Sequence, residues 1–162
     1  MQDYITTYTK KHFTIMEPKM ADIDINDIAH ALSLMTRANG HFSQFYSVGQ
    51  HSVGCAYEAL ERGYSARVVL GCLLHDGSEA YMADITRPLK QHMSAYLVAE
   101  EKLQNMIFEK FLGQCPSEEE MAQIKSVDDA MLFHEFKCFM NEELDIPEHE
   151  ILTRPASYQA SH

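Results

Sequence analysis

The chain has 162 residues, of which 46% are hydrophobic and 23% are charged, as is ordinary for one soluble globular domain. Its formal net charge of −11, from 24 Asp and Glu against 13 Lys and Arg residues, argues against nucleic acid as a partner, because binding a polyanion relies on basic surface. No apolar run approaches the ~20 residues of a membrane span, and the opening MQDYITTYTKKHF lacks the apolar stretch of a signal peptide, so we expect a cytoplasmic protein with no membrane partner.

The N-terminal segment predicts a short β-hairpin over about residues 3–16. The stretch YITTYTKKHFTI is rich in Tyr, Thr, Ile and Phe, which favour strands, and the pair Lys10-Lys11 divides it into two halves. Beyond Pro18 the apolar residues recur at helical spacing, and this pattern continues for most of the chain.

Helix-forming segments with recognisable ends follow one another from Asp24 onwards. Asp24 is a good N-cap for the first of them, and Asn39-Gly40 marks its end. Pro88 can open the fourth helix, and Ser117 with Glu120 forms a capping box that begins the fifth. The expected helices cover residues 25–37, 47–62, 66–76, about 88–112 and 117 to about 143.

We therefore predict an all-α helical bundle with a small N-terminal β-hairpin, built as a single domain over residues 1–145. The remaining residues, 146–162, are polar and are expected to form a loosely held C-terminal tail. The four cysteines form no CxxC pair and three of them lie in apolar helical patterns, which indicates free thiols in a reducing compartment.

Ionisable side chains fall on the apolar side of three predicted helices that are far apart in the sequence. His51 lies within the apolar stripe of one helix, His75 and Asp76 follow the apolar run VVLGCLL, and Asp128 lies on the apolar side of the last helix. For any one of these residues alone, a hydrogen-bonded core residue is the more common explanation. Two imidazoles and two carboxylates that converge in an apolar bundle destabilise one another unless a divalent cation organises them.

Imidazole nitrogen and carboxylate oxygen suit Mn, Co, Fe, Zn, Ni or Mg. We therefore predict one divalent metal ion per chain, held by His51, His75, Asp76 and Asp128. Thiolate ligands are absent from this set, which argues against a structural zinc site. Glu79 comes four residues after His75 and three after Asp76, so these side chains share one face if the helical turn continues.

A lone histidine, an adjacent His-Asp pair and a late aspartate, each on a helix, resemble the signature of the HD-domain metal-dependent phosphohydrolases. The segments DINDIAHALSLMTRANGHFSQFYSVGQHS, LLHDGSEAYMADITRPLK and VDDAMLFHEFKCFM are similar to a bacterial and phage subgroup that resembles the 5′-deoxynucleotidases. The matched segments lie between about Tyr4 and Met140. The resemblance implies an HD-domain helical bundle that hydrolyses phosphate esters.

By position, the resemblance implies metal ligation by the four residues named above and an acid/base role for Glu79 beside a metal-bound water. It also implies that Arg37 and Asp84 face the substrate phosphate and the attacking water, and it makes Lys90 a weaker phosphate candidate. Each of these has an alternative: a solvated carboxylate for Glu79, a helix-end cation for Arg37, a cap or turn for Asp84 and an ordinary surface lysine for Lys90.

Two further residues have two interpretations each. His41 follows a helix-ending glycine, so it is either a substrate-side donor or a loop histidine that caps the preceding helix. Glu135 is either a hydrogen-bond partner of a ligating histidine or the partner of a basic residue.

The chain departs from the family pattern at several positions. Ala38 stands where the subgroup often has an aromatic residue, so nucleoside preference stays open, and Gly49 and Gly77 stand where Ala is common. Ala80 follows Glu79, whereas HD-type guanosine tetraphosphate hydrolases carry Asp after that Glu. HD triphosphohydrolases that act on deoxynucleotides tend to place a His at the position of Glu79. We rank both of these activities lower.

The expected function is metal-dependent hydrolysis of a phosphate monoester, a nucleoside 5′-monophosphate or a similar small phosphometabolite. The alternative is a non-catalytic metal- and nucleotide-binding sensor module, for which Glu79 would not be needed. A di-iron oxygenase would need extra histidines after the His-Asp pair, and His92 is the only nearby candidate. A homodimer is left open, because no interface can be identified in the pattern.

Overall fold

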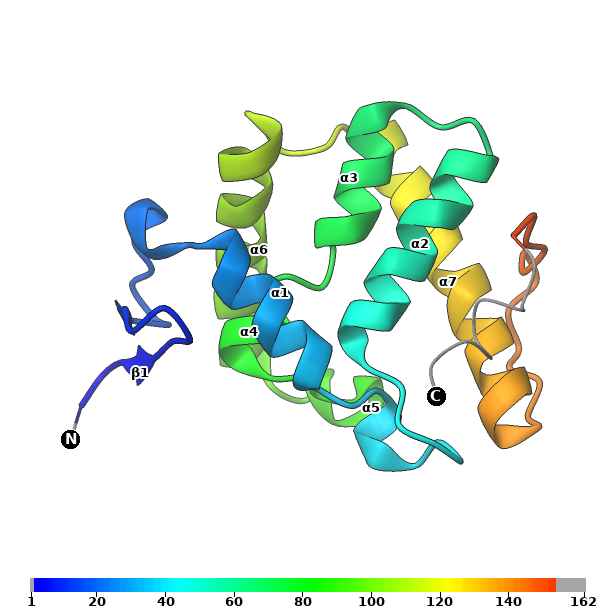
Figure 1. The fold of residues 1–162 in the computed structure, drawn as a ribbon, viewed down its shortest axis with the longest axis horizontal. Helices are drawn as coiled ribbons and strands as arrows, with labels where there is room; N and C mark the ends of the chain where they lie inside the picture. Colours follow the sequence, from blue (N-terminus) through cyan, green and yellow to red (C-terminus); the bar gives the residue numbers. More distant parts are fainter. Residues whose placement is uncertain (1, 154–162) are drawn as a thin grey trace.

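The computed structural model describes residues 2–153 as a bundle of helices with a small two-stranded sheet at the N-terminal end (Figure 1). In this sheet β1 (Ile5–Thr6) pairs antiparallel with β2 (His12–Phe13), with Ile5 opposite Phe13. The prediction of an all-α fold with a small N-terminal hairpin is confirmed. Among residues 2–153, no helix is both long enough and apolar enough to cross a membrane.

The helices follow the hairpin in chain order, and most are separated by short connections. They are η1 (Met20–Asp22), α1 (Ile25–Leu34), η2 (Ala38–Gly40), α2 (Val48–Glu61), α3 (Ala66–Leu74), α4 (Glu79–Met82), α5 (Arg87–Lys90), α6 (Ser94–Leu112) and α7 (Glu118–Met140).

Helices α1, α2 and α7 begin where a side chain accepts hydrogen bonds from the free N–H groups of the first turn, whereas α6 begins after Met93, which makes no such bond. The Asp24 carboxylate accepts from Asn26 N–H at the start of α1, as predicted. Ser117 and Glu120 form the predicted capping box of α7, and Ser47 with Gln50 forms a second box at α2. Local sequence therefore determines where these helices start.

The first predicted helix ends earlier than its spacing suggested. Met35 leaves the helical region with a ψ of 123°, and α1 stops at Leu34 instead of Arg37. The Arg37 N–H donates to the Tyr46 carbonyl at 2.8 Å, and Thr36 forms a β-bridge with Ser47. Pairing with the segment before α2 thus competes with the helix and turns Arg37 towards the bundle.

Other boundaries also differ from the predictions, and the last helix ends at Met140 rather than near Glu143, with Asn141 as a left-handed C-cap. The expected helix 66–76 ends at Leu74, and His75 is its C-cap. The expected helix 88–112 consists of two helices, α5 and α6, separated by residues 91–93. The chain after His75 continues through hydrogen-bonded turns, in which Gly77 N–H donates to Leu74 O at 2.8 Å and Glu79 N–H donates to Asp76 O at 3.0 Å.

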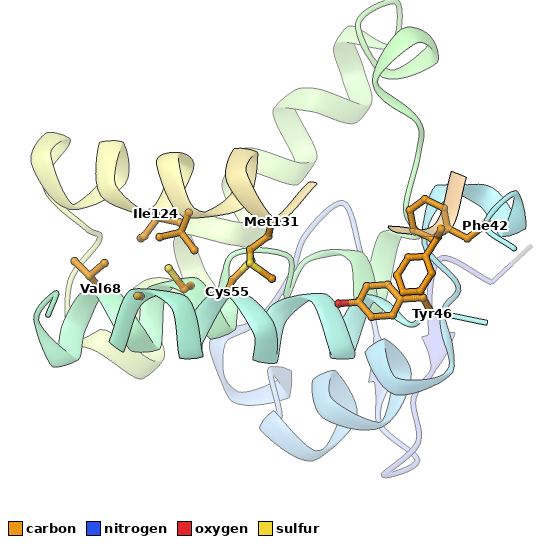
Figure 2. Packing of buried hydrophobic residues seen from close by; sticks show 10 residues of the cluster. Phe42, Tyr46, Cys55, Val68, Ile124 and Met131 are labelled. Carbon is orange, nitrogen blue, oxygen red and sulfur yellow. The ribbon is translucent and has the colours of Figure 1, made fainter. Parts of the chain in front are cut away.

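The core consists of two groups of buried apolar side chains. One joins the hairpin, α1 and α6, and includes Phe13, Ile28 and Leu103. The other joins α2, α3 and α7, and Figure 2 shows its members Val68, Ile124, Cys55 and Met131 between these helices, with Phe42 and Tyr46 at the far end. Burial of this apolar surface is the main force that holds α2, α3 and α7 together.

A close approach of α3 and α7 fixes the position of one helix along the axis of the other. A Cβ atom at Gly71 would lie 2.6 Å from Ile124 Cδ1, so a larger residue would push this side chain aside. One helical turn after Gly71 the chain reaches His75, and one turn after Ile124 it reaches Asp128. The packing at Gly71 therefore brings these two polar residues to the same level.

The described end of the chain packs against α2. The Glu58 carboxylate, which is fully buried, accepts hydrogen bonds from the backbone N–H groups of Leu152 and Thr153, each at 2.9 Å. Arg62 donates to the Glu150 carbonyl at 2.9 Å. Residues 150–153 of the predicted tail therefore make hydrogen bonds to α2, while residues 154–162 lie outside the described residues.

Candidate metal centre

The four predicted ligands come together where α2, α3 and α7 meet. His51 Nε2 lies 2.9 Å from Asp128 Oδ1 and 3.3 Å from His75 Nε2. His75 Nε2 lies 3.4 Å from both Asp76 Oδ2 and Asp128 Oδ1, and His51 Nε2 lies 3.8 Å from Asp76 Oδ2. Neighbouring ligand atoms around an ion at about 2.1 Å are roughly 3.0–3.4 Å apart, so these spacings are close to those of a coordination shell.

Both histidines are oriented through their other ring nitrogen. His51 Nδ1 contacts the buried Glu135 carboxylate, with Oε2 at 3.1 Å and a shorter contact to Oε1. His75 Nδ1 lies 2.5 Å from the carbonyl oxygen of Cys72. Carboxylate and carbonyl oxygens are acceptors, so each imidazole donates from Nδ1 and turns Nε2 towards the same space. This is the arrangement of histidines that ligate a metal ion through Nε2.

The centre attracts positive charge. Burial alone lowers the pKa of His75, but the carboxylates of Asp76 and Asp128 raise it to about 10. Burial alone raises the pKa of Asp128, but His75 and His51 hold it well below its usual range. Protons and a metal ion would compete for the same nitrogen and oxygen atoms, and metal binding at such a group releases protons.

Cys55 was not among the predicted ligands, yet its sulfur lies at the same place. Cys55 Sγ is 3.5 Å from His51 Nε2, and one ligand atom each from His51, Cys55, His75 and Asp128 lie within 4.8 Å of one another. This group could bind a metal ion. Cys55 follows His51 by one turn of α2, so its i, i+4 spacing was the available signal. Burial, together with nearby carboxylates, raises the pKa of the Cys55 thiol well above its usual range, which disfavours the thiolate that a metal would need.

Glu79 lies at the start of α4, with its side chain buried beside the centre. Its Oε2 atom has no hydrogen-bond partner among residues 2–153. Burial and the neighbouring carboxylates of Asp76 and Asp84 raise the pKa of Glu79 well above its usual range. A buried carboxyl oxygen without a partner within the described residues is costly.

Two alanines in strained backbone conformations adjoin the predicted substrate-side residues. Ala38, directly after Arg37, has a φ of 51°, and Ala83, directly before Asp84, has a φ of 73°. Residues with a Cβ rarely adopt these values, and such strain occurs mainly where the surrounding structure holds a binding or catalytic site in place. Asp84 is partly buried, and burial raises its pKa while Arg37 lowers it.

Arg37 lies against the metal centre rather than at a helix end on the surface. Its side chain is only 11% exposed, and its guanidinium is 3.1 Å from Glu135 Oε2 and 3.6 Å from Asp76 Oδ2. Glu135 therefore has both of the roles considered for it, as acceptor for His51 and as partner of a basic residue.

The structure does not bring His41 into the centre, and Lys90 acts there only through its charge, which lowers the pKa of Asp84. His41 is exposed at the end of η2, and no hydrogen bond or ion pair within the described part of the chain joins its imidazole to the ligands. Lys90 Nζ is 3.1 Å from Glu100 Oε2 on α6. The imidazole of His92, considered for a second iron, lies 3.4 Å from the side-chain amide of Gln91.

Arg87 was missed by the sequence interpretation. Its Nη2 atom lies 3.7 Å from Asp128 Oδ2 and 3.6 Å from Asp129 Oδ1, and its side chain is 66% exposed. Its place between Asp84 and Lys90 was the only signal in the sequence, and spacing alone could not show that α5 approaches α7.

A cavity of about 1000 Å³ lies apart from the ligand set, between α1, α2 and the described end of the chain. Its lining is mostly apolar and contains none of the four predicted ligands; it includes Ile28, Leu32, Val53, Tyr57 and Leu152. The buried Ser52 hydroxyl, which also lines it, has no hydrogen-bond partner among residues 2–153. The four predicted ligands therefore do not form the floor of this cavity.

Replacing Glu135 with Gln is expected to weaken metal affinity by about 10- to 100-fold, the usual effect of losing a partner of a ligating histidine. An amide is a weaker acceptor than a carboxylate for His51 Nδ1–H, and it leaves Arg37 with one counter-charge fewer. Calorimetric titration of Mn²⁺ into the metal-stripped parent and variant measures the two affinities.

Glu58→Gln is the matched control, because Glu58 is equally buried but holds the C-terminal backbone instead. It should leave Mn²⁺ affinity unchanged. Equal Mn²⁺ affinity in Glu135→Gln and the parent would contradict the role of Glu135.

The chain is similar in sequence to two bacterial proteins. No protein-family model matches it. It is 41% identical over 108 residues to the uncharacterized protein YfdR of Escherichia coli (strain K12), which covers 67% of this chain and 58% of YfdR. It is 30% identical over 106 residues to the uncharacterized protein RCAP_rcc00048 of Rhodobacter capsulatus, which covers 62% of this chain and 54% of that protein. The chain thus spans little more than half the length of these relatives.

Proposed function

We propose that the protein is an HD-type metal-dependent phosphohydrolase that cleaves a phosphate monoester, a nucleoside 5′-monophosphate or a similar small phosphometabolite. The observation that carries the proposal is the shared orientation of His51 and His75. Both rings use Nδ1 for a protein acceptor and present Nε2 to one space that Asp76 and Asp128 also face.

The residues of the centre fit one divalent ion. The donor set of two imidazoles and two carboxylates suits Mn, Co, Fe, Zn, Ni or Mg, and the attraction for positive charge is present before any ion binds. A bound ion would supply Lewis-acid activation of a water molecule and of a phosphoryl oxygen. Asp76 is preferred to Cys55 as the fourth ligand, because the thiol of Cys55 holds its proton.

Glu79 is proposed to move the proton of the attacking water. An ordinary glutamate is too weak a base for efficient proton transfer at neutral pH, and a raised pKa brings it nearer to the operating pH. The unpartnered Oε2 atom leaves one oxygen able to accept that proton. Asp84, whose pKa is also raised by burial, is proposed to orient the same water.

Arg37 is proposed to hold the site carboxylates and, through its charge rather than by a direct contact, to offset charge that develops on the phosphoryl group. Its ion pairs with Glu135 and Asp76 fix the guanidinium beside the ligands. A preorganised cation needs no rearrangement during the reaction, which is the main advantage of an enzyme site over water.

A screen of phosphate release tests the function. Metal-stripped protein is supplied with Mn²⁺, Co²⁺, Mg²⁺ or Zn²⁺ and offered nucleoside 5′-monophosphates and small phosphate esters. We expect release of inorganic phosphate from at least one monoester only when a metal is added, with phosphodiesters unchanged. The alternative of a nucleotide sensor predicts binding without release for every metal, and that outcome would reject the enzyme.

A further inference from the structure

We propose that Arg87, the first residue of α5, is a substrate-binding residue that contacts the solvent-facing oxygens of the substrate phosphate. This inference rests on the proposed function, because it names the contact through which the same site recognises its anion. The resemblance assigned this task to Arg37 and Lys90, and the contacts of the three cations lead to a different assignment.

Arg37 and Lys90 already bind carboxylates. Arg37 is nearly buried between Glu135 and Asp76, at 3.1 and 3.6 Å. Lys90 Nζ lies 3.1 Å from Glu100 on α6, and both side chains are mostly covered. To take up a phosphate, either cation would leave a poorly solvated carboxylate without its partner, which is unfavourable.

Arg87 makes no close ion pair of this kind. Its contacts with Asp128 and Asp129, at 3.7 and 3.6 Å, are longer than the about 2.7–3.2 Å of an N–H···O hydrogen bond. Ion pairs of this kind, with one side chain 66% exposed, contribute little to stability. The guanidinium can therefore exchange them for the stronger, two-pronged contact that a phosphate offers.

The position of Arg87 places it at the solvent end of the centre. Asp128 presents Oδ1 to His51 and His75 and Oδ2 to Arg87. His51 is fully buried, whereas Arg87 is exposed, so Arg87 lies on the solvent side of Asp128. Pro88 restricts the backbone beside it, at the start of α5.

The charge of the centre favours such a residue. Several carboxyl groups surround the ligands, and those that are ionised repel a phosphate dianion, so a further cation on the solvent side lowers this repulsion. The carboxyl groups in and around the centre are those of Asp76, Glu79, Asp84, Asp128 and Glu135.

The test measures two quantities in the Mn²⁺-loaded protein: the affinity for inorganic phosphate, by calorimetry, and the KM and kcat of phosphate release. Arg87→Gln is expected to weaken phosphate binding and raise KM by about tenfold, with metal content unchanged. Arg87→Lys should recover part of the loss, because an ammonium supplies charge without the fork. Lys125→Gln is the matched control, because Lys125 is equally exposed and also pairs with Asp129, at 2.6 Å, without an ion pair to Asp128.

Equal phosphate affinity in Arg87→Gln and the parent would overturn the inference, as would a parent that binds no phosphate. Loss of metal from Arg87→Gln would also overturn it, because Arg87 would then position Asp128 instead. Phosphate binding that depends on Arg87 in a parent without any turnover would reject the hydrolase and keep the anion site. If the parent hydrolyses monoesters and Arg87→Gln hydrolyses them with the same KM and kcat, the hydrolase is kept and the role of Arg87 is rejected.

Discussion

Replacing Glu79 with Gln is expected to lower phosphate release by about 10²- to 10⁴-fold, the usual contribution of a general acid–base residue. The amide keeps the size of the side chain but cannot take a proton from the attacking water. Because Glu79 is not one of the ligands, the metal content measured by elemental analysis should stay at the parental level. The helical circular dichroism signal should also be unchanged.

Glu79→Asp is the informative companion variant. It keeps a carboxylate but withdraws it by one methylene, so its rate should fall between those of the parent and Glu79→Gln. If Glu79→Gln retained more than about a third of the parental rate, far from the range for such residues, Glu79 would be a solvated carboxylate without a role in proton transfer.

Replacing Asp76 with Ala is expected to remove the metal ion and phosphate release together. The change takes away one of two carboxylates that face the histidine Nε2 atoms, and with it part of the attraction for a cation. Elemental analysis after dialysis against Mn²⁺ and buffer measures the metal content. Asp129→Ala is the control, because Asp129 pairs with Lys125 and Arg87 and has no ion pair to the two histidines.

Cys55→Ala distinguishes the two sets of ligands that the structure allows. If Asp76 is the fourth ligand, Cys55→Ala should keep its metal while Asp76→Ala loses it. The reverse outcome would assign the site to His51, Cys55, His75 and Asp128 and would contradict the carboxylate-based centre. Full metal content in both variants would reject a site that needs either residue.

Much of the fold was predictable because its signals are local. Hydrogen bonds from Asp24 and from the Ser117 capping box act within a few residues, so these helices start where the sequence predicts. The strand-forming residues around Lys10-Lys11 likewise form the hairpin. The end of α1 was missed because its competitor, the pairing of Arg37 with Tyr46, involves a segment that lies beyond the helix.

The ligand set could be proposed from the sequence for a different reason. Buried imidazole and carboxylate groups are costly, so their presence on the apolar sides of three helices already indicated a common partner. The four residues can converge only if those helices pack against one another. Their apolar stripes require such packing, because an apolar helix face must be buried. Distances, tautomers and pKa values lie beyond what periodicity can determine.

Only the tertiary structure decided what else surrounds that centre. The placement of Arg87 beside Asp128 and of Glu135 between His51 and Arg37 depends on how α5 and α7 are oriented, to within a few ångströms. That orientation results from close packing, such as the contact of Gly71 with Ile124, summed over many side chains. The sequence by itself determined which residue types had to be buried and partnered, and packing determined which partners they obtained, because no local rule specifies the distance between two helices.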